Sequence, residues 1–138
     1  MLIGSYKHQI DAKNRIRIPI AFKQQMQGPF VMSCSVNGCI GVYTRQQFEE
    51  IFSKYATSNQ FKAEEQKNFT KFFANLYEAE EDNQGRILVD GDLLKYAGIK
   101  KDVVTVGKFN HLEMWAPDRL YGDDEGFEKV FDYLGKVC

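Results

Sequence analysis

The sequence predicts a mainly β protein with peripheral helices, built from two tandem copies of one strand–turn–strand unit. Three observations support this fold class. Residues 11–18 align with residues 82–89 at a constant offset of 71. Short segments alternate between apolar and polar residues with a period of two, which is typical of half-buried strands. Gly, Asn and Pro residues separate these segments and indicate turns. The 138 residues, 43% of them hydrophobic, are enough for one domain or for two small ones that share a core.

The two copies agree at the positions that define a turn. The aligned pairs are Asp11 with Asp82, Arg15 with Arg86, Ile16 with Ile87, and Ile18 with Val89. At the fourth turn position Asn14 aligns with Gly85, and these residue types accept a positive φ most readily. A later segment, Cys39–Tyr43, aligns with His111–Trp115 at an offset of 72. The same order of matches in both halves indicates a duplicated unit.

The first copy begins with a strand whose alternate residues are Tyr6, His8 and Ile10. A turn at residues 11–14 leads to a second strand over Arg15–Ile18, which Pro19 ends. The elements expected next are a short helix over Ile20–Gln27 closed by Gly28, a strand over Phe30–Val36, a turn at Asn37-Gly38, and a strand over Cys39–Tyr43.

The second copy repeats this order. The expected strands are Tyr77–Glu81, Arg86–Val89, Val103–Lys108 and Leu112–Trp115, with a short helix around Leu93–Ala97 that Gly98 ends. Outside the copies, helices are expected over Thr44–Ala56, Lys62–Leu76 and Phe127–Leu134. Their aromatic residues, three or four positions apart, indicate core or subunit interface rather than a ligand site. The expected domain organisation is a first repeat with its trailing helix (1–56), a linker helix (57–76), a second repeat (77–121) and a C-terminal helix (122–138).

The charge is unevenly distributed along the chain. The net charge of −1 does not by itself suggest a nucleic-acid-binding protein. Residues 1–60, however, hold seven Lys or Arg against three acidic residues, a net charge of +4. Residues 78–138 hold eight basic against fourteen acidic residues, a net charge of −6. A basic first part beside an acidic last part favours an anionic partner for the first repeat.

The basic residues of the first copy cluster around its turn. Lys13, Arg15 and Arg17 occupy alternate positions, so along an extended strand they share one face, and Ile16 and Ile18 face a core. A narrow two-stranded ribbon with a basic outer face fits the major groove of DNA. We expect Arg15 to contact guanine with two hydrogen bonds, and Lys7, Lys13 and Arg17 to pair with phosphates, with Lys23 as a further candidate for a phosphate contact. The alternative is that this row of cations is a solvated face without a ligand.

Asp11 and Asp82 are expected to shape their turns rather than to contact a ligand. A carboxylate at the first turn position accepts a hydrogen bond from the backbone N–H two residues later, and it can pair with the Arg four residues later. Phosphates repel a carboxylate, which excludes direct contact with the DNA backbone. We therefore assign Asp11, Asn14, Asp82 and Gly85 to shaping the turns, and the Arg residues to contact.

The motif resembles that of a known family. A strand–turn–strand with Asp-x-x-x-Arg followed by Ile-x-Ile-Pro resembles the AbrB-like swapped-hairpin domain. Two copies in a chain of this length are similar to the MraZ family, and the segments Gly4–Arg15 and Tyr96–Gly107 add to the likeness. The resemblance extends to about Arg119. The sequence departs from the family pattern at Asn14, where Gly is usual, and at Val89-Asp90, where Ile-Pro is expected.

The resemblance implies both an architecture and a function. The two repeats would form a pseudo-twofold pair with one β-barrel-like core, and chains would assemble into a homo-oligomeric ring. The ring would bind short direct repeats of double-stranded DNA in the promoter of the cell-division and cell-wall gene cluster, including its own gene. It would act in the cytoplasm, associated with the nucleoid, without cofactor or small-molecule substrate. The expected DNA-binding residues are Lys7, Lys13, Arg15, Arg17 and Arg86.

Other functional classes have weaker support. The sequence contains no Gly-rich phosphate loop, nucleophile elbow or metal-spaced His/Cys set, so we expect no enzyme, catalytic residue or metal ligand. Lys7 and His8 interrupt the opening residues, and no apolar run approaches the roughly 18 residues of a membrane span, so neither signal peptide nor membrane segment is expected. Cys34, Cys39 and Cys138 are expected to be reduced thiols. Two alternatives stay open: an oligomeric structural or interaction protein, and an AbrB-type antitoxin.

Overall fold

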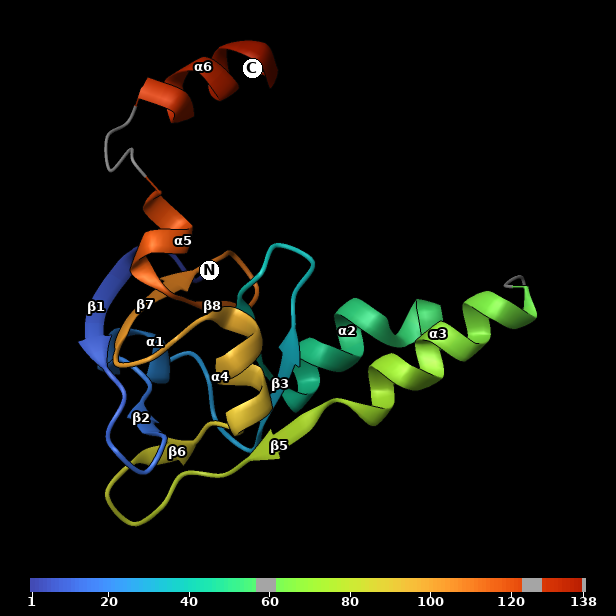
Figure 1. Ribbon diagram of the computed structural model, residues 1–138, viewed down its shortest axis with the longest axis horizontal. Coiled ribbons are helices and arrows are strands. Elements are labelled where there is room, and N and C mark those ends of the chain that lie inside the picture. The colour runs from blue at the N-terminus through green and yellow to red at the C-terminus, as the bar shows by residue number, and fades with distance from the viewer. Residues whose placement is uncertain (57–61, 123–127, 138) are drawn as a thin grey trace.

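The computed structural model describes residues 1–56, 62–122 and 128–137, and its fold is mainly β with helices on the periphery (Figure 1). This confirms the predicted fold class. The strands are β1 Ser5–Gln9, β2 Arg15–Arg17, β3 Phe30–Cys34, β4 Ile40–Thr44, β5 Tyr77–Ala79, β6 Arg86–Leu88, β7 Asp102–Gly107 and β8 Leu112–Trp115. The helices are α1 Ile20–Lys23, α2 Arg45–Ala56, α3 Ala63–Ala74, α4 Gly91–Ala97, α5 Pro117–Tyr121 and α6 Glu128–Val137.

The two repeats exchange strands. The larger sheet is antiparallel with the order β1-β7-β8-β4-β3-β5, and the smaller sheet pairs β2 with β6. Each strand next to an Asp-x-x-x-Arg turn therefore pairs with a strand of the other repeat: β1 with β7, β5 with β3, and β2 with β6. This exchange is the swapped-hairpin arrangement that the resemblance implies, whereas the two-stranded ribbon inferred from the first copy alone is formed between the repeats instead. An isolated hairpin is marginally stable, whereas exchange places the apolar faces of both repeats in one core.

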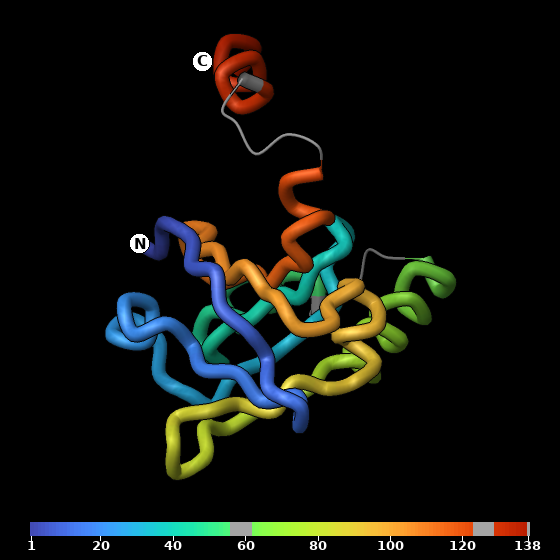
Figure 2. Tube along the Cα trace, turned by 60° about the vertical axis from the view of Figure 1, so that its left-hand side comes forward, coloured from blue at the N-terminus to red at the C-terminus, as the bar shows by residue number. Residues whose placement is uncertain are grey.

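The two-stranded sheet closes the barrel-like core. Strands β1 and β5 are the edges of the six-stranded sheet, and the chain continues from each through a turn into β2 and β6. Figure 2 shows these two segments side by side at the lower end of the molecule, running in opposite directions. Their inward residues join one apolar cluster with residues of the larger sheet and the helices, among them Ile16, Ile87, Phe22, Met32 and Leu112. The repeats consequently form one core.

Two helices differ from the expectation. Helix α1 ends at Lys23, although the sequence predicted helix as far as Gln27. Met26 is 1% exposed and belongs to the core, and Gly28 precedes Pro29, a position that disfavours helical geometry. The chain therefore leaves the helix early to bury Met26. Helix α5 is an addition to the predicted elements, and it begins with Pro117 at its first turn, where a missing N–H costs nothing.

Helices α2 and α3 form an antiparallel pair that projects from the sheet (Figure 1). Their aromatic rings face one another, with centroid distances of 6.2 Å for Phe48–Phe73, 5.5 Å for Phe52–Phe72 and 6.0 Å for Tyr55–Phe69. Tyr43 of β4 joins the pair to the sheet through edge contacts with Phe48 and Phe52. These aromatic residues thus pack between helices. The expected helix over Phe127–Leu134 corresponds to α6, and Phe127 itself lies outside the described residues.

Candidate nucleic-acid interface

The first turn is built around the Asp11 carboxylate. Its Oδ1 accepts hydrogen bonds from the backbone N–H groups of Lys13 at 2.9 Å and Arg15 at 2.8 Å. Its Oδ2 accepts a hydrogen bond from Nε of Arg15 at 2.9 Å. The backbone N–H of Arg15 makes the largest contribution to lowering the pKa of the Asp11 carboxyl, against a smaller opposing effect of desolvation. Asp11 therefore fixes both the turn and the direction of the Arg15 side chain.

The second turn has the same geometry. Asp82 Oδ1 accepts hydrogen bonds from the backbone N–H groups of Gln84 at 2.8 Å and Arg86 at 3.0 Å, and its Oδ2 accepts one from Arg86 Nε at 2.9 Å. The backbone N–H of Arg86 is the main cause of a lowered pKa at Asp82. The hydrogen bonds predicted for the two Asp residues are therefore present in both repeats.

The fourth turn residue adopts the predicted positive φ in both repeats. Asn14 has φ 62° and Gly85 has φ 75°. In the first turn the N–H of Asn14 donates to the carbonyl of Asp11 at 3.0 Å, and the N–H of Asp11 donates to the carbonyl of Arg15 at 2.9 Å. The left-handed residue lets the chain reverse within four positions, which explains why Asn and Gly occupy this place.

The ribbon formed by β2 and β6 presents one apolar and one basic face. Its register pairs Arg15 with Leu88, Ile16 with Ile87, and Arg17 with Arg86. Ile16 is 2% exposed and Ile87 0%, so these central residues point into the core. The residues on either side point outward, as the alternation predicted. Because the pairing joins the repeats, a single surface receives three arginines, two from the first repeat and one from the second.

The three arginines are held through their Nε atoms. Arg15 and Arg86 each donate from Nε to the Asp of their own turn, and Arg17 donates from Nε to the carbonyl of Gln84 at 3.1 Å. A guanidinium bound through Nε still carries four N–H donors on its two Nη atoms. These donors suit the paired acceptors of guanine or the oxygens of a phosphate. The ribbon therefore holds its basic groups in place before any ligand binds.

The two predicted lysines lie in different surroundings. Lys13 is exposed in the first turn, next to the ribbon. Lys7 lies on β1, with its Nζ 5.4 Å from the ring centroid of Tyr121 in α5. Asp11 lies four positions after Lys7 along the extended chain, a distance on the order of 13 Å. The structure groups Lys13 with the ribbon arginines and places Lys7 apart from them.

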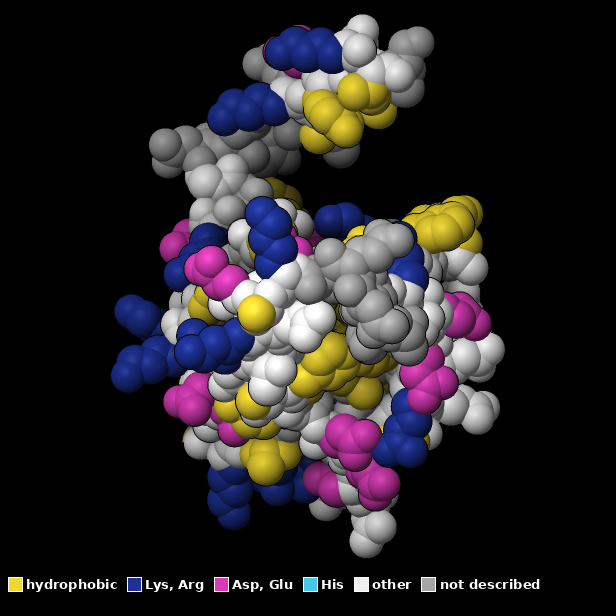
Figure 3. Space-filling model, turned by 90° about the vertical axis from the view of Figure 1, so that its right-hand side faces the viewer, with side chains coloured by type: hydrophobic (Ala, Val, Ile, Leu, Met, Phe, Trp, Pro, Cys, Tyr) yellow, Lys and Arg dark blue, Asp and Glu magenta, His cyan; other side chains and the backbone are white. Residues whose placement is uncertain are grey.

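Acidic residues of the second repeat border the basic surface. The carboxylate of Glu81 forms an ion pair with Lys23, and that of Glu78 forms one with Arg45 at 2.7 Å. Figure 3 shows Lys and Arg side chains at the lower end of the molecule beside Asp and Glu side chains. Cations of the first repeat thus partly neutralise the acidic residues that precede the second turn. Sequence spacing gave no signal for these pairs, because they join elements far apart in the chain.

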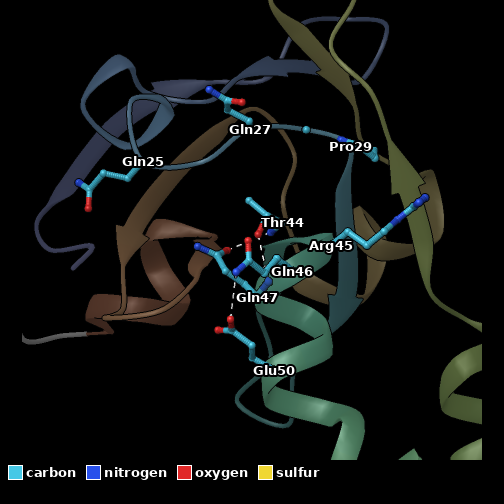
Figure 4. Close-up of a pocket in the computed structure, with 9 residues that line it drawn as sticks. Gln25, Gln27, Pro29, Thr44, Arg45, Gln46, Gln47 and Glu50 are labelled. Carbon is cyan, nitrogen blue, oxygen red and sulfur yellow. Dashed lines mark hydrogen bonds between the residues drawn. The ribbon is translucent and has the colours of Figure 1, made fainter.

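A polar recess lies away from the ribbon, between the loop after α1 and the start of α2 (Figure 4). It has a volume of about 490 Å³. Thr44 and Gln47 cap α2 reciprocally, since each backbone N–H donates to the other side chain, at 2.9 and 3.1 Å. Arg45 points toward β5, where its partner Glu78 lies. The recess is therefore lined by groups that stabilise the helix terminus.

Metal sites and membrane-spanning helices are absent from the residues that the structure describes. Within residues 1–56, 62–122 and 128–137, no cluster of His, Cys, Asp and Glu is arranged to hold a metal ion. Over the same residues, no helix combines the length and apolar character needed to cross a membrane. Cys34 and Cys39 are free thiols, and Cys138 lies outside the described residues. In the ribbon, arginines from both repeats converge on one outward face.

Comparison with known proteins identifies similar sequences. The family described as "MraZ protein, putative antitoxin-like" matches residues 1–71 and 72–121. A transcriptional regulator MraZ of Thermoanaerobacter sp. (strain X514) is 35% identical over 97% of this chain and 96% of its own length. That of Thermoanaerobacter pseudethanolicus is 34% identical over 99% of both chains. That of Mycoplasmoides gallisepticum is 34% identical over 83% of this chain and 81% of its own.

Proposed function

The chain belongs to the MraZ family, and on this premise we propose that it is a transcriptional regulator that binds double-stranded DNA through the β2–β6 ribbon. The observation that carries the proposal is the outward basic face of the ribbon. Arg15, Arg17 and Arg86 occupy it together, and hydrogen bonds hold all three side chains. A two-stranded ribbon of this kind fits the major groove.

Each residue has a role in this proposal. Arg15 and Arg86 contact base edges, because their Asp partners fix them at equivalent places in the two repeats. Lys13 and Arg17 pair with phosphates, and Lys7 makes a more distant phosphate contact from β1. Asp11, Asn14, Asp82 and Gly85 shape the turns that hold the ribbon. No catalytic role is assigned to any residue, and no cofactor or small-molecule substrate is required.

Assembly is a second part of the proposal. A single ribbon offers only a few phosphate contacts, which give weak affinity that falls steeply with salt. A homo-oligomeric ring would present several ribbons to successive short direct repeats, and the high effective concentration would raise the affinity. In this proposal, such repeats lie in the promoter of the cell-division and cell-wall gene cluster, including the protein's own gene, as the family resemblance implies. A regulator of this kind acts in the cytoplasm, at the nucleoid.

Fluorescence anisotropy with labelled promoter DNA tests the proposal. Wild type should bind with a steep dependence on salt, and Arg15→Ala should lose most of its affinity. Lys54→Ala is the control, because Lys54 is an exposed cation in the last turn of α2, outside the ribbon, and the variant should bind like wild type. Absence of any sequence preference in the wild type, even at low salt, would contradict the proposal and favour an interaction protein in which DNA binding is incidental.

A further inference from the structure

The outward face of the ribbon is not symmetric. The repeat offset of 71 makes Arg86 the equivalent of Arg15, and Leu88 the equivalent of Arg17. The register places Leu88 opposite Arg15 and Arg86 opposite Arg17. A twofold ribbon would carry four arginines at these positions. This ribbon carries three, and its fourth outward position is apolar.

Packing among the residues that the structure describes does not account for Leu88. Its neighbours Ile87 and Val89 are 0% and 1% exposed and belong to the core, whereas Leu88 is 62% exposed. Its backbone is held on both sides, by pairing with Arg15 and by the hydrogen bond from the Val89 N–H to the Asn14 carbonyl at 2.8 Å. A large apolar side chain therefore faces solvent from a backbone that is held in place, at the end of the ribbon and opposite Arg15.

The major groove offers a group that matches this side chain. Guanine, cytosine and adenine present hydrogen-bond donors and acceptors there, whereas thymine adds the apolar C5-methyl group. We propose that Leu88 contacts a thymine methyl group next to the base read by Arg15, and that it is a specificity-determining residue. The inference rests on the proposed function, since it requires the ribbon to enter the groove. Burial of both apolar groups against each other would then replace two unfavourable contacts with water.

The asymmetry also gives the ribbon a direction on DNA. A symmetric reader matches a palindromic site, because the symmetry of the protein is mirrored in its operator. With Leu88 at one end and Arg17 at the other, the two halves of the ribbon prefer different base pairs. Each ribbon should therefore bind a site that reads differently on the two strands. Such sites repeat in the same direction when several identical ribbons bind side by side.

Exchange of thymine for uracil isolates the methyl group. A binding site is first obtained by selecting random duplex DNA with the full-length protein, and each thymine of that site is then replaced by uracil, which pairs identically but lacks the methyl group. At one thymine in each repeat, uracil should weaken wild-type binding by roughly fourfold, the effect of one buried methyl group. In Leu88→Ala the same exchange should have no effect. Arg17→Ala, at the equivalent position, should retain the uracil effect.

The outcomes separate the two proposals. In one outcome, the protein selects a site whose binding requires Arg15, but uracil has the same effect in wild type and in Leu88→Ala. This result would overturn the role of Leu88 and leave the proposed function intact. Failure of the wild type to select any site would overturn both. Thermal unfolding of each variant checks the fold, and exposed Leu88 should tolerate substitution by Ala with a change in melting temperature of only a few degrees.

Discussion

Asp11 of the first repeat lies 3.9 Å from Arg86 of the second, measured from Oδ2 to Nη1. The same oxygen accepts the hydrogen bond from Arg15 Nε. One carboxylate therefore orients an arginine of its own repeat and attracts the equivalent arginine of the other. Asp82 binds Arg86 through Nε as well, so the guanidinium of Arg86 lies between two carboxylates. The two basic groups of the ribbon are thus electrostatically coupled through Asp11.

Substitution of the two aspartates should therefore have unequal effects. Asp11→Ala removes the anchor of Arg15 and the second partner of Arg86, whereas Asp82→Ala removes the anchor of Arg86 alone. We expect DNA affinity to fall in both variants and to fall further in Asp11→Ala, although each change removes one negative charge. Anisotropy titrations at matched salt measure this difference. Tighter binding in both variants would show that net charge rather than orientation governs affinity, and equal losses would contradict the additional role of Asp11 at Arg86.

Arg15→Lys separates charge from geometry. Lysine keeps the positive charge but lacks the planar fork that makes two hydrogen bonds to guanine. The variant should keep the salt dependence of the wild type and lose about 1–3 kcal/mol of discrimination against a changed base at one position of the site. Competition binding with single-base variants of the site measures the discrimination. Arg17→Lys is the control, because a phosphate contact should tolerate the exchange.

The local structure of the ribbon follows from the residue pattern, whereas the exchange of its strands was implied only by the resemblance to the swapped-hairpin domain. The Asp hydrogen bonds, the positive φ of Asn14 and the outward direction of Arg15 follow from residue types and a period of two. The same pattern is compatible with β2 pairing within its own repeat or with β6, because alternation fixes the face of a strand and not its neighbour. The exposure of Leu88 opposite Arg15 became visible only once the exchanged register was known.

Tertiary contacts also determine structure at places where the local sequence preference is misleading. The residues after Lys23 favour helix, yet burial of Met26 and the approach to Pro29 end α1 early. Glu78 and Glu81 form ion pairs with cations of the other repeat, Arg45 and Lys23. Charge counts along the chain treat this acidic segment as separate from the basic first part, although the fold brings the two together. Such contacts depend on the fold and have no signature in spacing.

Arg119 of α5 should contribute to stability without affecting DNA binding. Its Nη1 donates to the carbonyl oxygens of Gly38 at 3.0 Å and Tyr96 at 2.7 Å, and so joins the turn after β3 to the end of α4. Arg119→Ala should lower the free energy of unfolding by about 1–2 kcal/mol, the effect of losing two hydrogen bonds from a charged donor in a partly exposed site. Thermal unfolding should show a decrease of roughly 5 °C. Arg45→Ala, which breaks an exposed ion pair, should change stability by less than about 1 kcal/mol, and a similar decrease in both would contradict the role of Arg119.

Glu113 should make stability dependent on pH in the acidic range. Its side chain is 7% exposed, and its carboxylate lies 3.3 Å from Lys108 Nζ and 3.1 Å from Trp115 Nε1. Burial acts to raise the pKa, but hydrogen bonds from His111 and Trp115 and the charge of Lys108 lower it from 4.5 to about 2. Because the pKa of Glu113 is lower in the folded than in the unfolded state, the ionised carboxylate stabilises the folded protein above pH 4.5. This contribution, on the order of 2–3 kcal/mol, should be lost as the pH falls toward 2.

Urea unfolding of wild type and Glu113→Gln over this pH range measures the contribution of the one carboxylate. Glutamine is similar in size but does not ionise, so the variant should be less stable than wild type at neutral pH, and the difference should shrink as the pH falls below 4.5. Asp11 and Asp82, whose pKa values are also lowered, are present in both proteins and add the same pH dependence to each. The difference between the two curves therefore reports Glu113 alone, and curves that stay parallel down to pH 2 would show that its charge contributes nothing to the folded state.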